Sequence, residues 1–102
     1  MSVLQLRTYT INKGMMDSFI SLFNEHIRPV HERLGIPVQG TWVNLDRNEF
    51  IWMRKFDALE DIPAKEQSFF DSPERKSLGD LPPSHIAKME IKLIESVDNQ
   101  LT

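Results

Sequence analysis

Two arginines within predicted strands, Arg7 and Arg54, are the side chains of this sequence best suited to bind a small molecule. A guanidinium carries a planar fork of donors that matches the oxygens of a carboxylate or a phosphate. Because side chains alternate along a strand, Arg7 shares a face with Tyr9, and Arg54 shares a face with Trp52. If the two strands are neighbours, these four side chains converge, which predicts a concave site for an anion.

The same two arginines have a structural interpretation. Each could pair with a nearby carboxylate, such as Glu49 or Glu90, and only balance charge inside the fold. The sequence leaves both interpretations open.

The histidines do not predict a metal site. His26 and His31 are five residues apart, which places them about 140° apart around a helix. His31 borders an apolar stripe, so we interpret it as a hydrogen-bonded packing residue, with a general base or haem ligand as the alternative. His85 follows Ser84 without a third group to orient it, so no catalytic triad is predicted. We therefore expect neither a metal nor a cofactor.

Composition excludes several other kinds of chemistry. The chain has no cysteine, which removes disulfides, thiolate catalysis and cysteine-ligated metals. Twelve Lys and Arg face 15 Asp and Glu, a net charge of −3 without any basic block, so nucleic acid is not an expected partner. No stretch approaches the roughly 18 apolar residues of a membrane span, so we expect no membrane partner and a cytoplasmic location.

The elements that must position these residues form one domain over residues 1–102, with an ordered core of about 3–97. Residues 3–11 are typical of a strand. Apolar residues then recur at three- and four-residue steps from Met15 to Leu34, which predicts an amphipathic helix that ends at Gly35 and is kinked or restarted at Pro29.

The second half of the chain continues the alternation of strands and helices. The pattern predicts a hairpin of strands 36–45 and 49–56, a helix capped by Asp57 that runs to Phe70, a short helix from Ser72 to Leu78, a loop over 81–84, a strand over 86–97 and a frayed tail over 98–102. Pro63 limits where the regular part of the second helix can begin.

The predicted order is βαββαβ, an α+β, ferredoxin-like fold with a four-stranded antiparallel sheet and two helices on one face. The other face of the sheet would be uncovered. If Ile51 and Met53 meet the helices, Phe50, Trp52 and Phe56 lie on that open face. A soluble monomer seldom exposes such a patch, so we expect a homodimer through the open sheet face, with the anion site inside the resulting barrel.

Several short segments resemble the NIPSNAP family. They are Leu6-Arg7-Thr8-Tyr9-Thr10, Lys13-Gly14, His26-Ile27-Arg28-Pro29-Val30-His31, Gly35-Ile36, Gly40-Thr41-Trp42, the run from Phe50 to Asp57, and Ser72-Pro73-Glu74. The resemblance implies the dimeric α/β-barrel superfamily, which includes cofactor-independent monooxygenases and haem-degrading enzymes. It implies no agreed reaction. Many members carry Trp after Ser-Pro-Glu, whereas this chain has Arg75, so the pocket lid here would differ.

Three functional interpretations follow, and whether the chain is an enzyme is left open. The first is a dimer that binds a small apolar anion at the sheet face. The alternative is a cofactor-independent monooxygenase or related barrel enzyme that holds an aromatic substrate with Trp42, Trp52, Arg7 and His31. The third is a structural module whose barrel is filled by its own aromatic side chains. The candidate ligand-binding residues are Arg7, Tyr9, Trp42, Trp52, Arg54 and His31. Cavity volume separates the interpretations, since a drug-sized ligand needs about 300 Å³.

Overall fold

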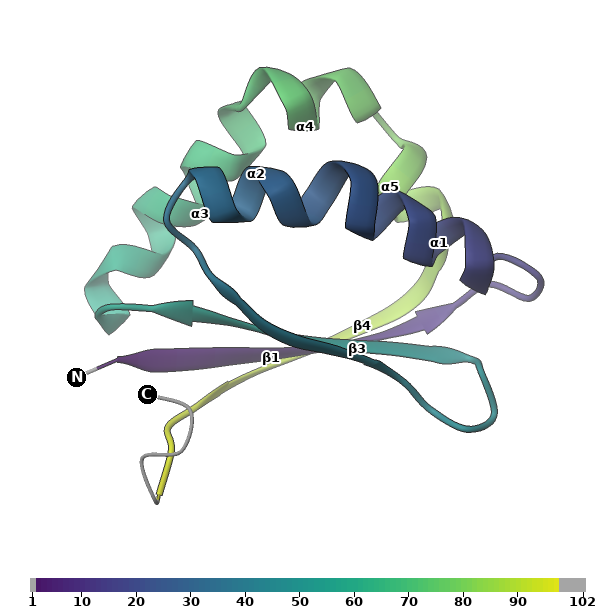
Figure 1. The fold of residues 1–102 in the computed structure, drawn as a ribbon, viewed down its shortest axis with the longest axis horizontal. Helices are drawn as coiled ribbons and strands as arrows, with labels where there is room; N and C mark the ends of the chain where they lie inside the picture. Colours follow the sequence, from purple (N-terminus) through teal and green to yellow (C-terminus); the bar gives the residue numbers. More distant parts are fainter. Residues whose placement is uncertain (1, 98–102) are drawn as a thin grey trace.

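A computed structural model describes residues 2–97 of the chain. Four strands form one antiparallel sheet in the order β2-β3-β1-β4. They are β1 (Val3–Ile11), β2 (Val38–Val43), β3 (Glu49–Phe56) and β4 (Ile86–Ile94). The labelled helices all lie on one side of this sheet (Figure 1). The predicted α+β, ferredoxin-like architecture is confirmed, including the pairing of the first strand with the third.

The first helical segment is continuous in space but changes its winding. It consists of α1 (Met16–Leu22), a π-helical turn η1 (Phe23–Ile27) and α2 (Arg28–Arg33). The Arg28 amide donates to the carbonyl of Phe23, five residues earlier. Pro29 follows at the start of α2, where the wide turn accommodates a ring that would clash inside a regular α-helix. The predicted disturbance at Pro29 is therefore confirmed as a change of helix type.

The second helical region is divided into four short pieces. They are η2 (Leu59–Asp61), a 3₁₀ turn, followed by α3 (Ile62–Asp71), α4 (Pro73–Leu78) and α5 (Leu81–Ser84). As predicted, Pro63 lies in the first turn of α3. The predicted cap at Asp57 is wrong, because the 3₁₀ turn begins after Ala58. The predicted loop over 81–84 is also wrong: prolines fit a first helical turn, where their missing N–H needs no partner.

Two predicted helix ends are confirmed. Gly35 has a φ of +74°, and the amide of Ile36 donates to the carbonyl of His31 at 2.9 Å, which closes α2 in the manner of a Schellman motif. Ser72 is the N-cap of α4, since its Oγ accepts from the amide of Arg75 at 3.2 Å.

Two strand ends fall short of the prediction. The first hairpin strand covers only 38–43, because the chain turns at Asn44, whose side-chain oxygen accepts from the amides of Asn48 and Glu49. The last strand ends at Ile94 rather than Val97. The tail over 98–102 lies outside the described residues.

The face that meets the helices is the opposite of the one predicted for β3. Phe50, Trp52 and Phe56 are 2–3% exposed and belong to the cores between sheet and helices. Their assignment to the open face, with Ile51 and Met53 against the helices, is wrong. Alternation fixes which residues share a face but not which face is covered, and the helices bury the face with the larger aromatic area.

The open face carries smaller apolar side chains and one tryptophan. Leu6 pairs with Met53 across β1 and β3, and Trp42 pairs with Ile51 across β2 and β3. The indole of Trp42 folds over Gly40, where an added Cβ would lie 2.6 Å from the ring, and remains 48% exposed. No labelled helix lies against this side of the sheet in Figure 1. Within residues 2–97, no helix has both the length and the apolar character needed to cross a bilayer.

Candidate functional site

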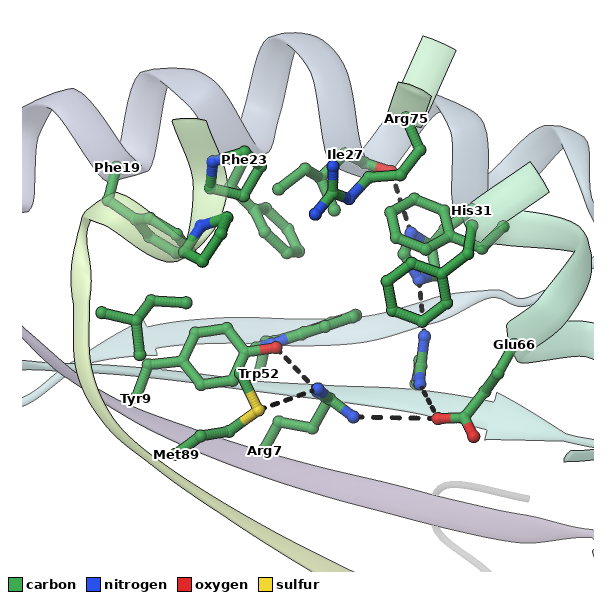
Figure 2. A pocket seen from close by; sticks show the side chains of 16 residues that line it. Arg7, Tyr9, Phe19, Phe23, Ile27, His31, Trp52, Glu66, Arg75 and Met89 are labelled. Carbon is green, nitrogen blue, oxygen red and sulfur yellow. Dashed lines mark hydrogen bonds and ion pairs between the residues drawn. The ribbon is translucent and has the colours of Figure 1, made fainter. Parts of the chain in front are cut away.

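A cavity of about 240 Å³ lies between the sheet and the helices (Figure 2). Its lining comes from β1, β3, β4 and every helical segment except η2, and most of it is aromatic or aliphatic. The lining residues are Arg7, Tyr9, Phe19, Phe23, Ile27, His31, Trp52, Arg54, Glu66, Phe69, Phe70, Arg75, Pro82, Pro83, Ile86 and Met89.

The helical wall of the cavity is a stripe with a four-residue step, formed by Phe19, Phe23, Ile27 and His31. In a regular α-helix such a stripe drifts by about 40° at each step, because one turn takes 3.6 residues. The wide turn η1, which starts at Phe23 and ends at Ile27, counteracts this drift. The π-helical turn therefore keeps His31 facing the same cavity as Phe19.

Arg54 is held in the interior by three side chains. Its side chain is 5% exposed. Its Nε donates to Gln5 Oε1 at 2.8 Å, its Nη1 to His31 Nε2 at 2.8 Å and its Nη2 to Glu66 Oε2 at 2.6 Å. Each nitrogen thus has a strong acceptor, so the Arg54 side chain is held in a fixed position on the sheet side of the cavity.

Arg7 lies next to Arg54 but has weaker partners. Its Nε donates to the Tyr9 hydroxyl at 2.7 Å, its Nη1 to Gln5 Oε1 at 2.9 Å and its Nη2 to Met89 Sδ at 3.2 Å. A thioether sulfur is a weak acceptor. The nearest carboxylate oxygen, Glu66 Oε2, is 3.9 Å from Nη1. Arg7 Nη2 is therefore free to take a better acceptor.

His31 is buried and hydrogen-bonded at both ring nitrogens, as the packing interpretation predicts. Its Nδ1 lies 2.9 Å from the carbonyl of Ile27, which can only accept, so Nδ1 carries the proton and Nε2 accepts from Arg54. Burial lowers the pKa of His31 to about 4, and the charges of Arg54 and Arg7 act in the same direction. At neutral pH the imidazole is therefore uncharged.

The floor of the cavity has more positive than negative charge. Burial lowers the pKa of Arg54 to about 10, with the charge of Arg7 adding to the effect, so Arg54 stays protonated at neutral pH. Arg7 and Arg54 share one carboxylate, Glu66, through the same oxygen. Among the described residues, one positive charge at this floor is therefore left without a counter-charge.

Five of the six candidate residues line this cavity. Arg7 and Trp52 are cross-strand partners, and Tyr9, His31 and Arg54 surround them. Arg7 and Arg54 also lie over the Trp52 ring, with Cζ 5.8 Å and 5.4 Å from its centroid.

Two expectations about this site are wrong. The cavity lies on the helix-covered face of a single chain rather than inside a barrel, and Trp42 points to the opposite face, because the neighbouring Thr41 pairs with Trp52.

The carboxylate partner of the arginines was missed. It is Glu66 of α3 rather than Glu49 or Glu90. The signal was present in the sequence, because Glu66 follows Ile62 by four residues and precedes Phe69 by three, which places it on the buried stripe of α3. An acid in such a stripe requires a cation opposite.

The far side of the cavity is formed by α4 and its neighbours. Arg75, which follows the Ser72-Pro73-Glu74 segment, lines the cavity and donates from Nη1 to the carbonyl of Gly79 at 2.9 Å. Its guanidinium enters from the α4 side in Figure 2, while Arg7 enters from the sheet side. Its Cζ lies 5.7 Å from the centroid of the Phe70 ring.

The remaining histidines lie outside the cavity. His26 is at the surface, with Nε2 3.9 Å from Glu25. His85 is 1% exposed and has polar contacts to Ser18 Oγ at 2.8 Å and to the carbonyl of Leu81 at 2.8 Å. Across residues 2–97, no group of three or more histidine, aspartate or glutamate side chains could hold a metal ion.

Comparisons with known proteins agree with the fold. A NIPSNAP family protein from Agrobacterium tumefaciens superposes with a TM-score of 0.87 at 16% identity, covering 97% of this chain and 96% of that chain. An uncharacterised NIPSNAP domain protein from Burkholderia xenovorans gives 0.84 at 13% identity, with 95% and 96% covered. A protein from Bacteroides thetaiotaomicron, provisionally described as an antibiotic biosynthesis monooxygenase, gives 0.74 at 15% identity, with 94% and 90% covered.

At these identities the superpositions show that the fold is shared, and they give no information about the chemistry. No curated protein sequence matches the chain. The NIPSNAP family model matches residues 4–98, which is nearly the whole chain and includes every residue of the cavity. The chain therefore belongs to the NIPSNAP family.

Proposed function

We propose that the protein binds a small, largely apolar carboxylate in the cavity between the sheet and the helices. The observation that carries this proposal is the charge at the floor, where Arg7 and Arg54 share the single carboxylate of Glu66. A cation that is poorly solvated and incompletely paired attracts an anion strongly, because little water screens the interaction.

Arg7 is the residue that takes the ligand. Its Nη2 donates only to the sulfur of Met89, whereas every nitrogen of Arg54 has an oxygen or nitrogen acceptor. A carboxylate oxygen would replace the thioether and gain a charge-assisted hydrogen bond. Arg54, His31 and Glu66 then act as positioning residues that hold Arg7 and Trp52.

The walls define the rest of the ligand. Phe19, Phe23 and Phe69 face the cavity from the helices, and Trp52 faces it from the sheet. Such a lining favours an apolar body, and an aromatic ring gains from edge contacts with these rings. At about 240 Å³ the cavity is below the range of drug-sized ligands, so a compact molecule fits best.

The alternative of an oxygen-using enzyme has weaker support. It rests on the likeness of fold to the Bacteroides protein. His31, the natural base in the cavity, is uncharged with Nδ1 committed to a carbonyl and Nε2 committed to Arg54, so no lone pair is available to take a proton from a substrate. Binding therefore describes these residues better than proton transfer does.

The proposal includes a homodimer through the open sheet face. Trp42 is 48% exposed there, beside its half-buried cross-strand partner Ile51. Apolar side chains on a face without helices favour a second copy of the same surface. The cavity lies on the other face, so each copy would hold its own ligand.

The binding test compares benzoate with benzamide, which has a similar shape but no charge. Titration calorimetry with the wild type should detect benzoate and find benzamide weaker by roughly tenfold or more, the value of one charge-assisted contact. Arg7→Met, which keeps the apolar stem, should remove the difference. Arg47→Met, at a surface arginine paired with Asp17, is the matched control and should retain it. Equal binding of the two probes to the wild type, or no binding of benzoate, would refute the proposal.

A further inference from the structure

We propose that Arg75 forms a second anion subsite at the α4 side of the cavity, so that the preferred ligand is a short apolar dicarboxylate with its charges at opposite ends. This inference rests on the proposed carboxylate site at Arg7 and narrows the ligand class.

Local structure fixes the position of Arg75. The residue lies in the first turn of α4, where its amide donates to Ser72 Oγ at 3.2 Å. Its guanidinium donates to the carbonyl of Gly79 at 2.9 Å and lies 5.7 Å from the Phe70 ring centroid. These contacts tie both the backbone and the side chain, so the guanidinium is aimed into the cavity, as Figure 2 shows.

The charge of Arg75 is not neutralised by any residue that the structure describes. Arg33 and Arg47 at the surface each have a carboxylate oxygen within 2.6–2.7 Å. Within residues 2–97, no carboxylate lies within ion-pair distance of Arg75, and the adjacent Glu74 accepts from Nε and Nη2 of Arg33. Arg75 thus offers unused donors to the cavity.

The two cationic ends are separated by apolar wall. In Figure 2, Arg7 lies against the sheet and Arg75 against the helices, with Phe23 and Ile27 beside the space between them. Two separate anions would each lose translational freedom on binding. One molecule that reaches both ends loses it only once. The arrangement therefore favours a dicarboxylate with an apolar body over two small anions.

The experiment compares terephthalate with its monomethyl ester, which has the same body and only one charge. Calorimetry at low salt should show terephthalate binding roughly tenfold tighter than the ester in the wild type. Arg75→Met should abolish this preference while the ester still binds. Arg75→Lys, which keeps the charge, should restore part of the preference, and Arg47→Met should leave it unchanged. In about 1 M salt the preference should shrink, because salt screens the charge of the half-buried Arg75.

The outcomes separate this inference from the proposed function. If the wild type binds the two probes equally, the second subsite is refuted while the Arg7 site stands. If Arg75→Met weakens both probes to the same extent, Arg75 only shapes the cavity, and the subsite is again refuted. If neither probe nor benzoate binds the wild type, the subsite and the proposed function are both refuted.

Discussion

Arg54 Nη2 and Glu66 Oε2 form a 2.6 Å ion pair that joins β3 to α3 beneath the cavity. The same oxygen lies 3.9 Å from Arg7 Nη1. The pair therefore fixes α3 over the sheet and also sets the charge of the site, because one carboxylate serves two guanidinium groups.

Replacing Glu66 by Gln should destabilise the fold. The change leaves Arg7 and Arg54 without a counter-charge, and breaking a buried pair in this way costs about 3 kcal/mol or more. We expect a loss of stability at the lower end of this range, because the Glu66 side chain is 32% exposed and water reduces the cost. Urea unfolding measures the loss, with Glu60→Gln at the exposed η2 turn as control. Unchanged stability of Glu66→Gln would show that the pair contributes nothing.

His31 should make the stability depend on pH. Its pKa is about 4 in the folded protein and 6.5 when unfolded, so the unfolded chain binds an extra proton between these values. The contribution of His31 to the free energy of unfolding is therefore complete above pH 6.5. About 3 kcal/mol of it is lost as the pH falls towards 4. Urea unfolding across this range should show a shallower decline in His31→Gln than in the wild type. His26→Gln, at the surface, should follow the wild type; a His31→Gln curve parallel to the wild type would contradict the assignment.

The open face predicts the oligomeric state. Trp42→Glu places a charge where two sheets would meet, and burying it unpaired is costly. Light scattering should find a dimer for the wild type and a folded monomer for this variant. Leu59→Glu, at an exposed site on the helical side, should remain dimeric. A monomeric wild type at micromolar concentration would remove the dimer from the proposal.

Ser72→Ala should link the cap to the second subsite. Loss of the N-cap hydrogen bond to the Arg75 amide should cost about 1 kcal/mol of stability. The preference for terephthalate over its monomethyl ester should also fall, because Arg75 is less well positioned. Ser77→Ala, at an exposed site on the same helix, is the control. If Ser72→Ala keeps the full wild-type preference for terephthalate over its monomethyl ester, the cap does not position Arg75.

The strands and helices were largely predictable because local signals determine them. Strand alternation, the glycine at position 35 and the serine cap at position 72 each act through nearby backbone geometry, and each prediction is confirmed. Alternation also identified Arg7, Tyr9, Trp52 and Arg54 as candidates that share one face, which the register bears out.

The covered face was not predictable by alternation alone. Burial of Trp52 and burial of Ile51 fit the same two-residue period. Only the packing of Phe19 and Phe23 against the sheet decides between them. Glu66 and Arg75 reach the site through tertiary packing of α3 and α4. The spacing of Ile62, Glu66 and Phe69 indicates that Glu66 lies on the buried side of α3, but it does not show which cation pairs with it.

The most direct measurement is a crystal structure with 4-bromobenzoate, whose bromine can be located by anomalous scattering. The account predicts the bromine inside the cavity lined by Trp52 and Phe69, with a carboxylate oxygen about 3 Å from Arg7 Nη2 and the Met89 sulfur displaced. Bromine found only outside the cavity, or a carboxylate bound away from Arg7, would contradict the claim that Arg7 is the anion site.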